Sequence, residues 1–263
     1  MKFRIIARLD IKKDRLIKGV HLEGLRVVGD PLERALKYYD QGVDELLLID
    51  AVASLYQRNH LTEVIQRICQ EIFIPVTVGG GIRSIGDAQA LFDAGADKVA
   101  INTAAMADPG LLEQLSRRFG AQAVVLSIQA KKHPEDSSRW VAMTDNGRES
   151  SRRCVGDWVA HAQNLGIGEI LLTSIDQEGT AAGYDIDLIQ SVAAITTAPV
   201  LASGGFAISE DALRVIQAGA QAAVIAQALH YDKLTITQIK QDLLTNNVAV
   251  RQSDLSANTV VEC

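Results

Sequence analysis

The segment QGVDELLLID (residues 41–50) recurs later in the chain as LGIGEILLTS (residues 165–174). A second pair follows these copies, IPVTVGGGI (74–82) and APVLASGGF (198–206), and equivalent residues of both pairs lie 124 positions apart. Each segment contains a short run of β-branched and other apolar residues, which is typical of a buried strand. Repetition at a constant offset over several elements indicates two tandem copies of one structural unit.

Eight apolar runs of this kind alternate with longer segments of helical periodicity. The runs are FRIIARL (3–9), ELLLID (45–50), IPVTVG (74–79), KVAIN (98–102), AVVLSI (123–128), EILLTSI (169–175), PVLAS (199–203) and AAVIA (222–226). The segments between them, such as DPLERALKYYDQG and SIGDAQALFDAGA, open near an Asp or Ser cap and close on Gly. Eight strand–helix units in about 250 residues predict an α/β fold, a single (β/α)8 TIM barrel built from two half-barrels.

The repeat also sets the domain limits. The barrel is expected to cover residues 1–250, and the tail at 251–263 lacks periodicity and is expected to be disordered. The first strands of the two halves, which end on Asp10 and Gln129, lie only 119 positions apart, so the second half has five extra residues after its first strand. The stretch HPEDSSRW (133–140) predicts a short hairpin there.

Composition excludes several classes of function. The chain has 263 residues, 48% of them apolar, enough for a sizeable core. Its net charge of -6, with scattered lysines and arginines, disfavours a nucleic-acid surface. No apolar run approaches the ~20 residues that cross a membrane, and the opening MKFRIIARLD is too short for a signal peptide, so we expect a cytoplasmic protein.

Metal and cofactor sites are not expected either. The three cysteines show neither CxxC nor zinc-ligand spacing, so buried or inert thiols are the favoured interpretation. The five histidines, His21, His60, His133, His161 and His230, lack HxH or HExxH spacing and are predicted to be surface or loop residues.

Glycines follow two equivalent strands, in VGGGIRS (78–84) and ASGGFAIS (202–209). In a (β/α)8 barrel the carboxyl ends of all strands meet at one mouth, where the chemistry takes place. Glycine lets the backbone approach an anion, and N–H groups at a helix start bind phosphate. Either motif alone is also explained by turn chemistry. Two of them at a 124-residue offset predict a bisphosphate substrate with one phosphate on each side of the mouth.

Two equivalent strands end on different polar residues. The run IIARLD ends on Asp10, whereas VVLSIQ ends on Gln129. The pseudo-symmetry places these two side chains opposite each other at the mouth. A carboxylate can transfer protons, but an amide cannot near neutral pH. We therefore predict that Asp10 carries any acid/base chemistry.

At full length the sequence resembles a known family. The stretches RIIARLDIKKDRLIKGV, GVDELLLIDAVAS, IPVTVGGGIRS, GADKVAINTAA and GIGEILLTSIDQEGTAAGYD are similar to the cyclase subunit of imidazole glycerol phosphate synthase, from about residue 3 to residue 250. The resemblance implies a lyase/cyclase of histidine biosynthesis. Such an enzyme takes ammonia from a glutaminase partner subunit, in a heterodimer, and uses it on a phosphoribulosyl-formimino aminoimidazole carboxamide ribotide. It also implies that ammonia enters along the barrel axis, from the face opposite the active site.

The resemblance assigns roles at the mouth. The first catalytic aspartate of the family falls on Asp10, and the second falls on Gln129, which alters that acid/base position. The implied substrate and phosphate contacts are Lys18, Asp50, Gly80, Gly81, Asn102, Thr103, Thr173, Asp176, Gly179, Ser203, Gly204, Gly205, Ala226 and Gln227. Gln227 stands where the family has a smaller serine, so it should narrow one phosphate pocket. The family's mobile loop after the first strand has a glycine that Lys12–Arg15 lacks, and Glu178 stands where Asp is more common.

Four charged residues at strand starts resemble the family's ammonia gate, and they are Arg4, Glu45, Lys98 and Glu169. Asp97 matches a residue that contacts the partner subunit. Alternating charges at this end of a barrel also form ordinary ion-pair layers. The combination at four equivalent positions favours a retained ammonia entrance.

Three functions from different classes remain open. The first is the cyclase, with Asp10 as the acid/base residue. The second is a divergent paralogue that supplies ammonia for the amidation of nucleotide sugars or surface polysaccharides. The third is a non-catalytic scaffold that activates a glutaminase. A histidine-pathway isomerase of the same ancestry is a further rival, which INTAA (101–105) and the charged gate disfavour.

Overall fold

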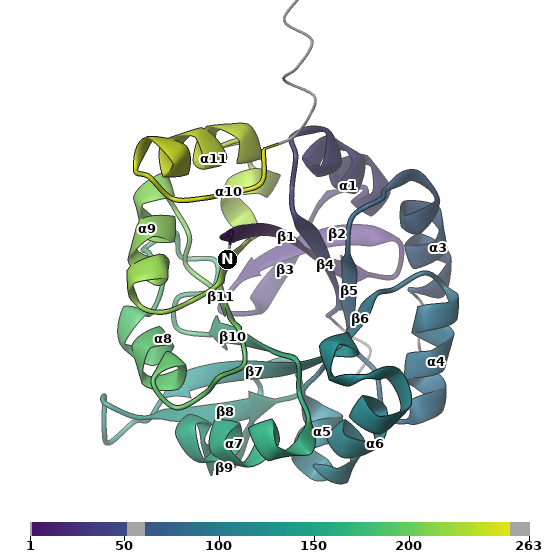
Figure 1. The fold of residues 1–263 in the computed structure, drawn as a ribbon, viewed down its shortest axis with the longest axis vertical. Coiled ribbons are helices and arrows are strands. Elements are labelled where there is room, and N and C mark those ends of the chain that lie inside the picture. Colours follow the sequence, from purple (N-terminus) through teal and green to yellow (C-terminus); the bar gives the residue numbers. More distant parts are fainter. Residues whose placement is uncertain (1, 52–60, 253–263) are drawn as a thin grey trace, which may run out of the picture.

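The computed structural model describes residues 2–51 and 61–252, and these residues form a closed barrel (Figure 1). Its parallel strands are β1 (Arg4–Lys12), β4 (Glu45–Asp50), β5 (Val76–Gly79), β6 (Lys98–Ile101), β7 (Val124–Lys132), β10 (Glu169–Ser174), β11 (Val200–Ser203) and β12 (Ala222–Ile225). Each strand pairs in parallel with the next, and β12 pairs with β1 to close the ring. Within the described residues this confirms the predicted eight-stranded (β/α)8 barrel.

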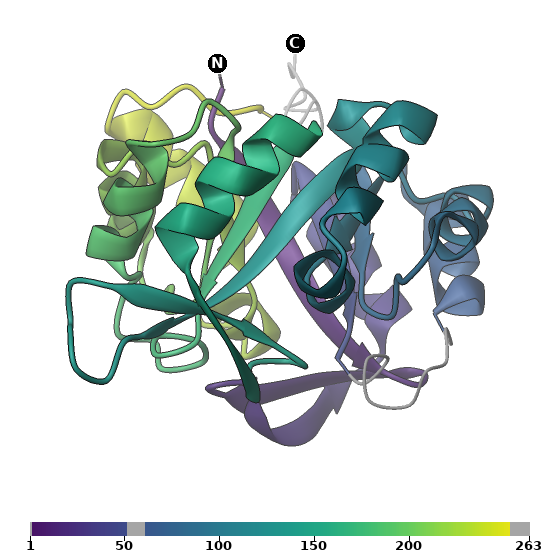
Figure 2. The ribbon, with the colours of Figure 1, turned by 90° about the horizontal axis from the view of Figure 1, so that it is seen from below.

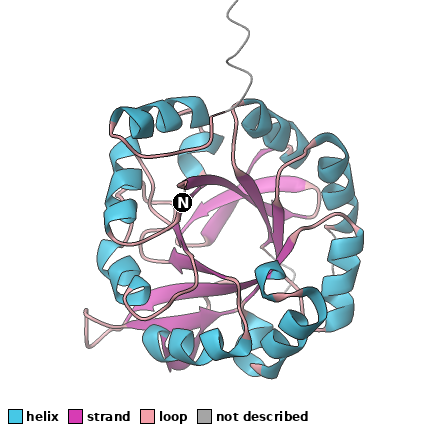
Figure 3. Ribbon diagram, viewed as in Figure 1, coloured by secondary structure: helices cyan, strands magenta, loops and turns pink. Residues whose placement is uncertain are grey.

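Helices surround the barrel as an outer ring (Figure 3). They are α1 (Pro31–Asp40), α3 (Thr62–Glu71), α4 (Ile85–Asp93), α5 (Thr103–Ala107), α6 (Gly110–Phe119), α7 (Val155–Ala162), α8 (Ile186–Ala193), α9 (Ser209–Gln217), α10 (Gln227–His230) and α11 (Ile236–Thr245). Short 3-10 turns lie at Ala121–Ala123 and Gln163–Leu165. The predicted caps are present, because Asp30 accepts from the Glu33 N–H and Ser84 accepts from the Asp87 N–H.

Alternation along each strand divides the core into two layers. On β1, Ile5, Ala7 and Leu9 face outward and pack under the helices. The inward residue Ile6 instead belongs to a compact apolar layer inside the barrel, completed by Leu47, Ala100, Val125, Leu171, Leu201, Ala222 and Val224. Beyond this layer the inward positions become polar. The same alternation therefore builds the core and directs polar side chains toward the mouth.

Each half-barrel begins with a strand that continues into an antiparallel hairpin. Strands β2 (Arg15–Val20) and β3 (Glu23–Gly29) follow β1, and strands β8 (Trp140–Thr144) and β9 (Glu149–Cys154) follow β7. The β2–β3 hairpin lies at the end of the barrel away from the N-terminus (Figure 2). Lys132 pairs with Trp140, which confirms the predicted hairpin at 133–140.

The segment Lys12–Arg15, which lacks the glycine of the family's loop, connects β1 to β2. Lys12 pairs directly with Arg15, so this segment is a tight turn between β1 and β2, with Lys13 at a φ of 59°. The ladder extends this far because Ile11 and Leu16 are both fully buried and continue the apolar pattern beyond Asp10.

The predicted disordered tail at 251–263 stays a prediction, because residues 253–263 lie outside the described residues. Arg251 does not extend freely: its guanidinium donates to the Val43 carbonyl and pairs with Asp44. Phe3 forms a bridge with Val250, which joins the N-terminal and C-terminal parts of the described chain. In the described part of the chain, no helix has the length and apolar character needed to cross a membrane.

Candidate active site

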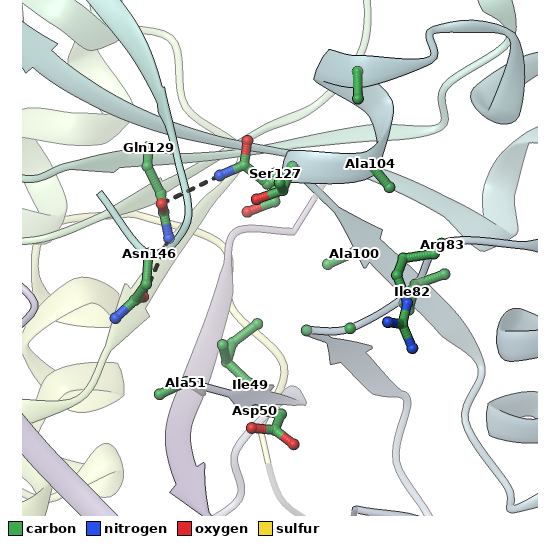
Figure 4. A pocket seen from close by; sticks show the side chains of 15 residues that line it. Ile49, Asp50, Ala51, Ile82, Arg83, Ala100, Ala104, Ser127, Gln129 and Asn146 are labelled. Atoms are coloured by element: carbon green, nitrogen blue, oxygen red, sulfur yellow. Dashed lines mark hydrogen bonds between the residues drawn. The ribbon is translucent and has the colours of Figure 1, made fainter. Parts of the chain in front are cut away.

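The carboxyl ends of β4 to β7 surround an open pocket of about 280 Å³ (Figure 4). The predicted residues that line it are Asp50, Gly80, Gly81, Asn102, Thr103 and Gln129. Arg83 lines the same pocket directly after the glycines. A cationic side chain beside glycine backbone is the arrangement that binds a phosphate group.

A second pocket lies on the other side of the mouth and is almost closed, with a volume of about 10 Å³. It contains the predicted set Gly179, Ser203, Gly204, Gly205, Ala226 and Gln227. Arg8 and Glu178 also line it, and the Oε1 atom of Gln227 is buried there without a hydrogen-bond partner among the described residues. The two predicted phosphate positions therefore lie in separate pockets, and the narrowing predicted for Gln227 is on the side that has closed.

The glycines of the two pockets adopt equivalent backbone conformations. Gly80 has a φ of +100° and Gly204 a φ of +97°, a region that favours glycine. A Cβ atom at Gly80 would lie 2.5 Å from the Asp50 carbonyl oxygen, and one at Gly204 would lie 2.6 Å from that of Ser174. Asp50 and Ser174 are themselves 124 positions apart. Both turns therefore require glycine, for the same steric reason.

Asp10 is buried at the end of β1 and is held by a charge network. The Nε atom of Arg8 donates to Asp10 Oδ1 at 2.8 Å, and the Nζ atom of Lys18 lies 3.9 Å from Oδ2. Burial alone would raise the pKa of Asp10, but Arg8 and then Lys18 outweigh it, so the pKa lies below its usual value. Asp10 is thus a carboxylate at neutral pH, and a weaker base than an aspartate without cationic neighbours.

Lys18 reaches the mouth from the β2–β3 hairpin. Its ammonium group forms an ion pair with Glu178, and both side chains are almost completely buried. The hairpin is fixed against the loop after β10, because the His21 N–H donates to the Glu178 carbonyl at 2.8 Å. Gly179 permits this contact, since a Cβ atom there would lie 2.4 Å from the Gly19 carbonyl oxygen. The hairpin therefore covers the closed side of the mouth.

Gln129 ends the inward face of β7, four strands from Asp10 around the ring. Its Oε1 atom accepts from Asn102 Nδ2 at 3.2 Å, and its Nε2 atom donates to Asn146 Oδ1 at 3.5 Å. Asn102 also donates to the Met143 carbonyl at 3.0 Å. The two bonds of Gln129, dashed in Figure 4, hold its amide at the pocket wall. In this position Gln129 can orient a ligand by hydrogen bonds.

Other residues that were predicted to contact the substrate form hydrogen bonds to other parts of the protein. Thr173 accepts from Arg8 Nη1 at 3.4 Å, and Thr103 Oγ1 accepts from the Asp145 N–H at 3.0 Å. Asp176 accepts from the Lys132 N–H at 2.8 Å and lines neither pocket. It therefore secures the end of β7.

The four predicted gate residues form a closed ring at the opposite end of the barrel. Arg4 pairs with Glu45 at 3.1 Å and with Glu169 at 2.7 Å, while Lys98 pairs with the same two carboxylates at 3.0 and 2.7 Å. Thr77 adds a hydrogen bond to Glu45 at 2.5 Å. The apolar layer that includes Ile6 lies between this charged ring and the mouth.

A groove of about 350 Å³ opens at the same face, beside the start of β5. Asp97, the predicted partner contact, lines it and is exposed, and its carboxylate accepts from the Val76 N–H at 2.8 Å. Phe73 also lines the groove with 79% of its surface exposed, the largest value among the exposed apolar residues described. An exposed aromatic ring beside a groove is typical of an interaction surface.

The sequence prediction missed four residues of the mouth: Arg8, Arg83, Ser127 and Asn146. Strand alternation could have found Arg8 and Ser127, because they lie two positions before Asp10 and Gln129 and share their face. Asn146 belongs to a DNG turn signal between β8 and β9. Within the described residues, no group of three or more His, Cys, Asp or Glu side chains is arranged to hold a metal ion.

The histidine prediction was wrong at one position. His230 is only 2% exposed and lies in α10, where its Nδ1 atom is 2.7 Å from the Tyr38 hydroxyl. Burial lowers the pKa of His230 to about 4. His60 lies outside the described residues.

Comparison with known proteins gives consistent relationships over nearly the whole chain. The family described as "Histidine biosynthesis protein" matches residues 4–235. A Legionella pneumophila protein is 57% identical over 208 residues, covering 79% of this chain and 97% of its own. A Mycobacterium tuberculosis protein (strain ATCC 25177 / H37Ra) is 44% identical over 252 residues, covering 94% of both chains. A Mycobacterium bovis protein (strain BCG / Pasteur 1173P2) is 43% identical over the same length. All three are named "Imidazole glycerol phosphate synthase subunit HisF".

Proposed function

This chain belongs to the histidine biosynthesis protein family, and we propose on that premise that it is the cyclase subunit of an imidazole glycerol phosphate synthase. Its substrates are ammonia and the phosphoribulosyl-formimino aminoimidazole carboxamide ribotide. Its products are imidazole glycerol phosphate and the aminoimidazole ribotide. The observation that carries the proposal is the buried Asp10 carboxylate at the end of β1, at the same mouth as two glycine-lined pockets, although Asp10 lines neither of them.

The positions of the residues at this mouth support a different role in the reaction for each of them. Ring closure with loss of an amine requires proton transfers, and a positioned acid/base group typically contributes 10²–10⁴-fold to the rate. Asp10 supplies the carboxylate at this mouth, and its cationic neighbours keep it ionised while lowering its basicity. The open pocket, with Gly80, Gly81 and Arg83, supplies donors and positive charge for a phosphate. Gln129 contributes hydrogen bonds in place of the second proton carrier.

Ammonia is proposed to come from a glutaminase subunit bound at the ring end of the barrel. Three features of this end support the proposal: the closed charged ring, the exposed Asp97, and Phe73 beside its groove. An aromatic side chain next to a pocket is a common anchor in protein interfaces. As an enzyme of this pathway, the protein is proposed to work in the cytoplasm.

The direct test is turnover of the phosphoribulosyl ribotide by the purified chain, with ammonium salt at alkaline pH. We expect measurable product from the unmodified protein. Asp10→Asn should lower kcat at least about 100-fold, within the range for loss of an acid/base group. Gln129→Asp should raise kcat at least about tenfold, because it restores a carboxylate at the equivalent strand end. Full activity in Asp10→Asn would refute the assigned role of Asp10.

A second function is favoured by one observation, the combination of an intact charged ring with an amide at residue 129. A barrel that passes ammonia to a different acceptor needs the ring but not the second carboxylate. In the same assay, no product from either the unmodified protein or Gln129→Asp would favour this role. If the chain without cyclase activity still stimulated a glutaminase, it would be folded. The absence of product would then reflect a different role and not a failure to fold.

A further inference from the structure

Arg8 is a buried cation in the interior of the barrel. It lies on β1, two residues before Asp10, so both side chains point inward, directly above Ile6 of the apolar layer. Only 3% of Arg8 is exposed. Burial of a charge is costly unless the group is paired and hydrogen-bonded, so the contacts of Arg8 determine what it does there.

The guanidinium group of Arg8 joins three strands. Its Nε atom donates to Asp10 Oδ1 on β1 at 2.8 Å. Its Nη1 atom donates to Thr173 Oγ1 on β10 at 3.4 Å and to Ser203 Oγ on β11 at 3.3 Å. Because the planar guanidinium is anchored at both sides, it fixes the direction in which Asp10 Oδ1 points. Asp10 Oδ2 lies 3.9 Å from Lys18 Nζ, beyond hydrogen-bond distance.

The second half-barrel has a different residue at the position equivalent to Arg8. Its equivalent in the second half-barrel, 119 positions later, is Ser127. Ser127 lines the open pocket of about 280 Å³, whereas Arg8 lines the closed pocket of about 10 Å³. A long cationic side chain therefore stands where the equivalent position has a short hydroxyl, and it contributes to the difference between the two pockets.

We propose that Arg8 is the positioning residue of this site, which holds Asp10 as an oriented carboxylate with one oxygen committed to the barrel wall and the other directed to the mouth. The proposal rests on the acid/base role of Asp10 in the proposed function. It assigns to Arg8 a part in the reaction through Asp10, without contact with the reacting atoms.

Among the other charged groups around Asp10, Lys18 also lowers its pKa, but Arg8 contributes more. Lys18 faces it from β2 but shares its charge with Glu178, which approaches from the loop after β10. His230 faces it from α10, and burial keeps this ring neutral at pH 7. Asp50, at the end of β4, lines the same mouth and adds negative charge. Arg8 is the cation in direct contact with the Asp10 carboxylate.

The test is a titration of Asp10 by NMR of the protein labelled with ¹³C in its aspartate carboxyl groups, with Asp10→Asn to assign the signal. In Arg8→Gln, which keeps an N–H donor near the position of Nε but is shorter and uncharged, we expect the Asp10 midpoint to rise by about one pH unit or more. Arg117→Met, which removes an exposed arginine on α6, is the control and should leave the midpoint unchanged. An unchanged midpoint in Arg8→Gln would overturn the proposal.

Arg8→Lys keeps a cation at this position and serves as the second variant if Arg8→Gln does not fold. Its Asp10 midpoint should stay below the ordinary value of 3.8, and a higher midpoint would also overturn the proposal. Because these titrations need no turnover, they test Arg8 separately from the proposed reaction. In the folded variants, loss of the guanidinium fork should also lower kcat with ammonium at least about tenfold, since misplaced catalytic groups slow the reaction.

Discussion

His230 shows how a single buried side chain makes the stability of this barrel depend on pH. Its Nδ1 atom contacts the Tyr38 hydroxyl, and its Nε2 atom has no hydrogen-bond partner among the described residues. Burial lowers its pKa from 6.5 to about 4, because an imidazolium in this buried site would lose its hydration. The folded protein therefore keeps this ring neutral at pH values where the unfolded chain charges it.

This difference predicts an acid-sensitive fold. As pH falls below 6.5, the unfolded chain binds a proton that folded His230 does not, so the free energy of unfolding decreases. The loss should continue to about pH 4 and reach about 3 kcal/mol. Urea unfolding at several pH values measures it. His230→Gln should flatten the dependence over this range, and an equal slope in the variant would contradict the assignment.

The site residues divide into those that sequence can and cannot predict. Asp10, Gln129 and the two glycine pairs were identified because their positions at strand ends follow from the repeat. Arg8 is in the same strand, but its partners Thr173 and Ser203 lie 165 and 195 positions away, so its role depends on the three-dimensional ring. His230 was misassigned because spacing motifs report metal ligands and say nothing about burial.

At the scale of elements, the strands follow the predicted order closely, and the differences lie where ladders extend. Strands β1 and β7 run three or more residues past their predicted ends because they pair with the hairpins β2 and β8. The apolar runs alone did not reveal this, since Gln129 and Lys131 interrupt the pattern in β7. Hydrogen bonds to β2 and β8, together with the burial of Ile11 and Ala130, stabilise the ends of β1 and β7 as strands despite the polar residues there.

One side chain links several elements at the ring end of the barrel. Asp44, directly before β4, accepts from the Ile5 N–H at 2.7 Å, from Lys240 Nζ at 2.6 Å and from Arg251 Nε at 3.1 Å. Lys240 of α11 is buried, and it also donates to the Gly42 carbonyl at 2.7 Å. Asp44 therefore holds β1, α11 and the C-terminal segment together.

We expect Asp44→Ala to lower the free energy of unfolding by about 3–5 kcal/mol, because it leaves the buried Lys240 ammonium without its carboxylate. Asp232→Ala is the matched control, since it breaks exposed ion pairs to Arg34 and Lys37, and it should cost about 1 kcal/mol or less. Urea denaturation measures both. Equal effects would show that the Asp44 cluster contributes no more than a surface pair.

At the scale of the whole molecule, the charged ring and the mouth lie at opposite ends of one apolar interior. Four ion pairs close the ring at this end of the barrel. If ammonia passes through it from a bound glutaminase, the ring must keep that ammonia from escaping. Its integrity should therefore control how efficiently the two reactions are coupled.

Lys98→Met removes two of the four ion pairs and leaves Arg4 to bind both carboxylates. In the complex with a glutaminase, we expect the number of glutamines hydrolysed per product formed to rise at least about threefold, as ammonia leaks from the opened ring. Lys37→Met, on the exposed side of α1, should leave this ratio unchanged. A ratio unaffected by Lys98→Met would indicate that the ring is an ordinary ion-pair layer.

The two pockets differ in volume, so the two sides of the mouth are not equivalent. Duplication produced two glycine turns of the same shape, yet one faces a space of about 280 Å³ and the other about 10 Å³. A ligand whose two ends both carry a phosphate could bind a symmetric mouth in either of two orientations, head to tail or reversed. Here a phosphate beside Gly80 would meet Arg83 in an open pocket, whereas one beside Gly204 would meet Arg8 and Gln227 in a nearly closed one. The two orientations of such a ligand should therefore differ in binding free energy.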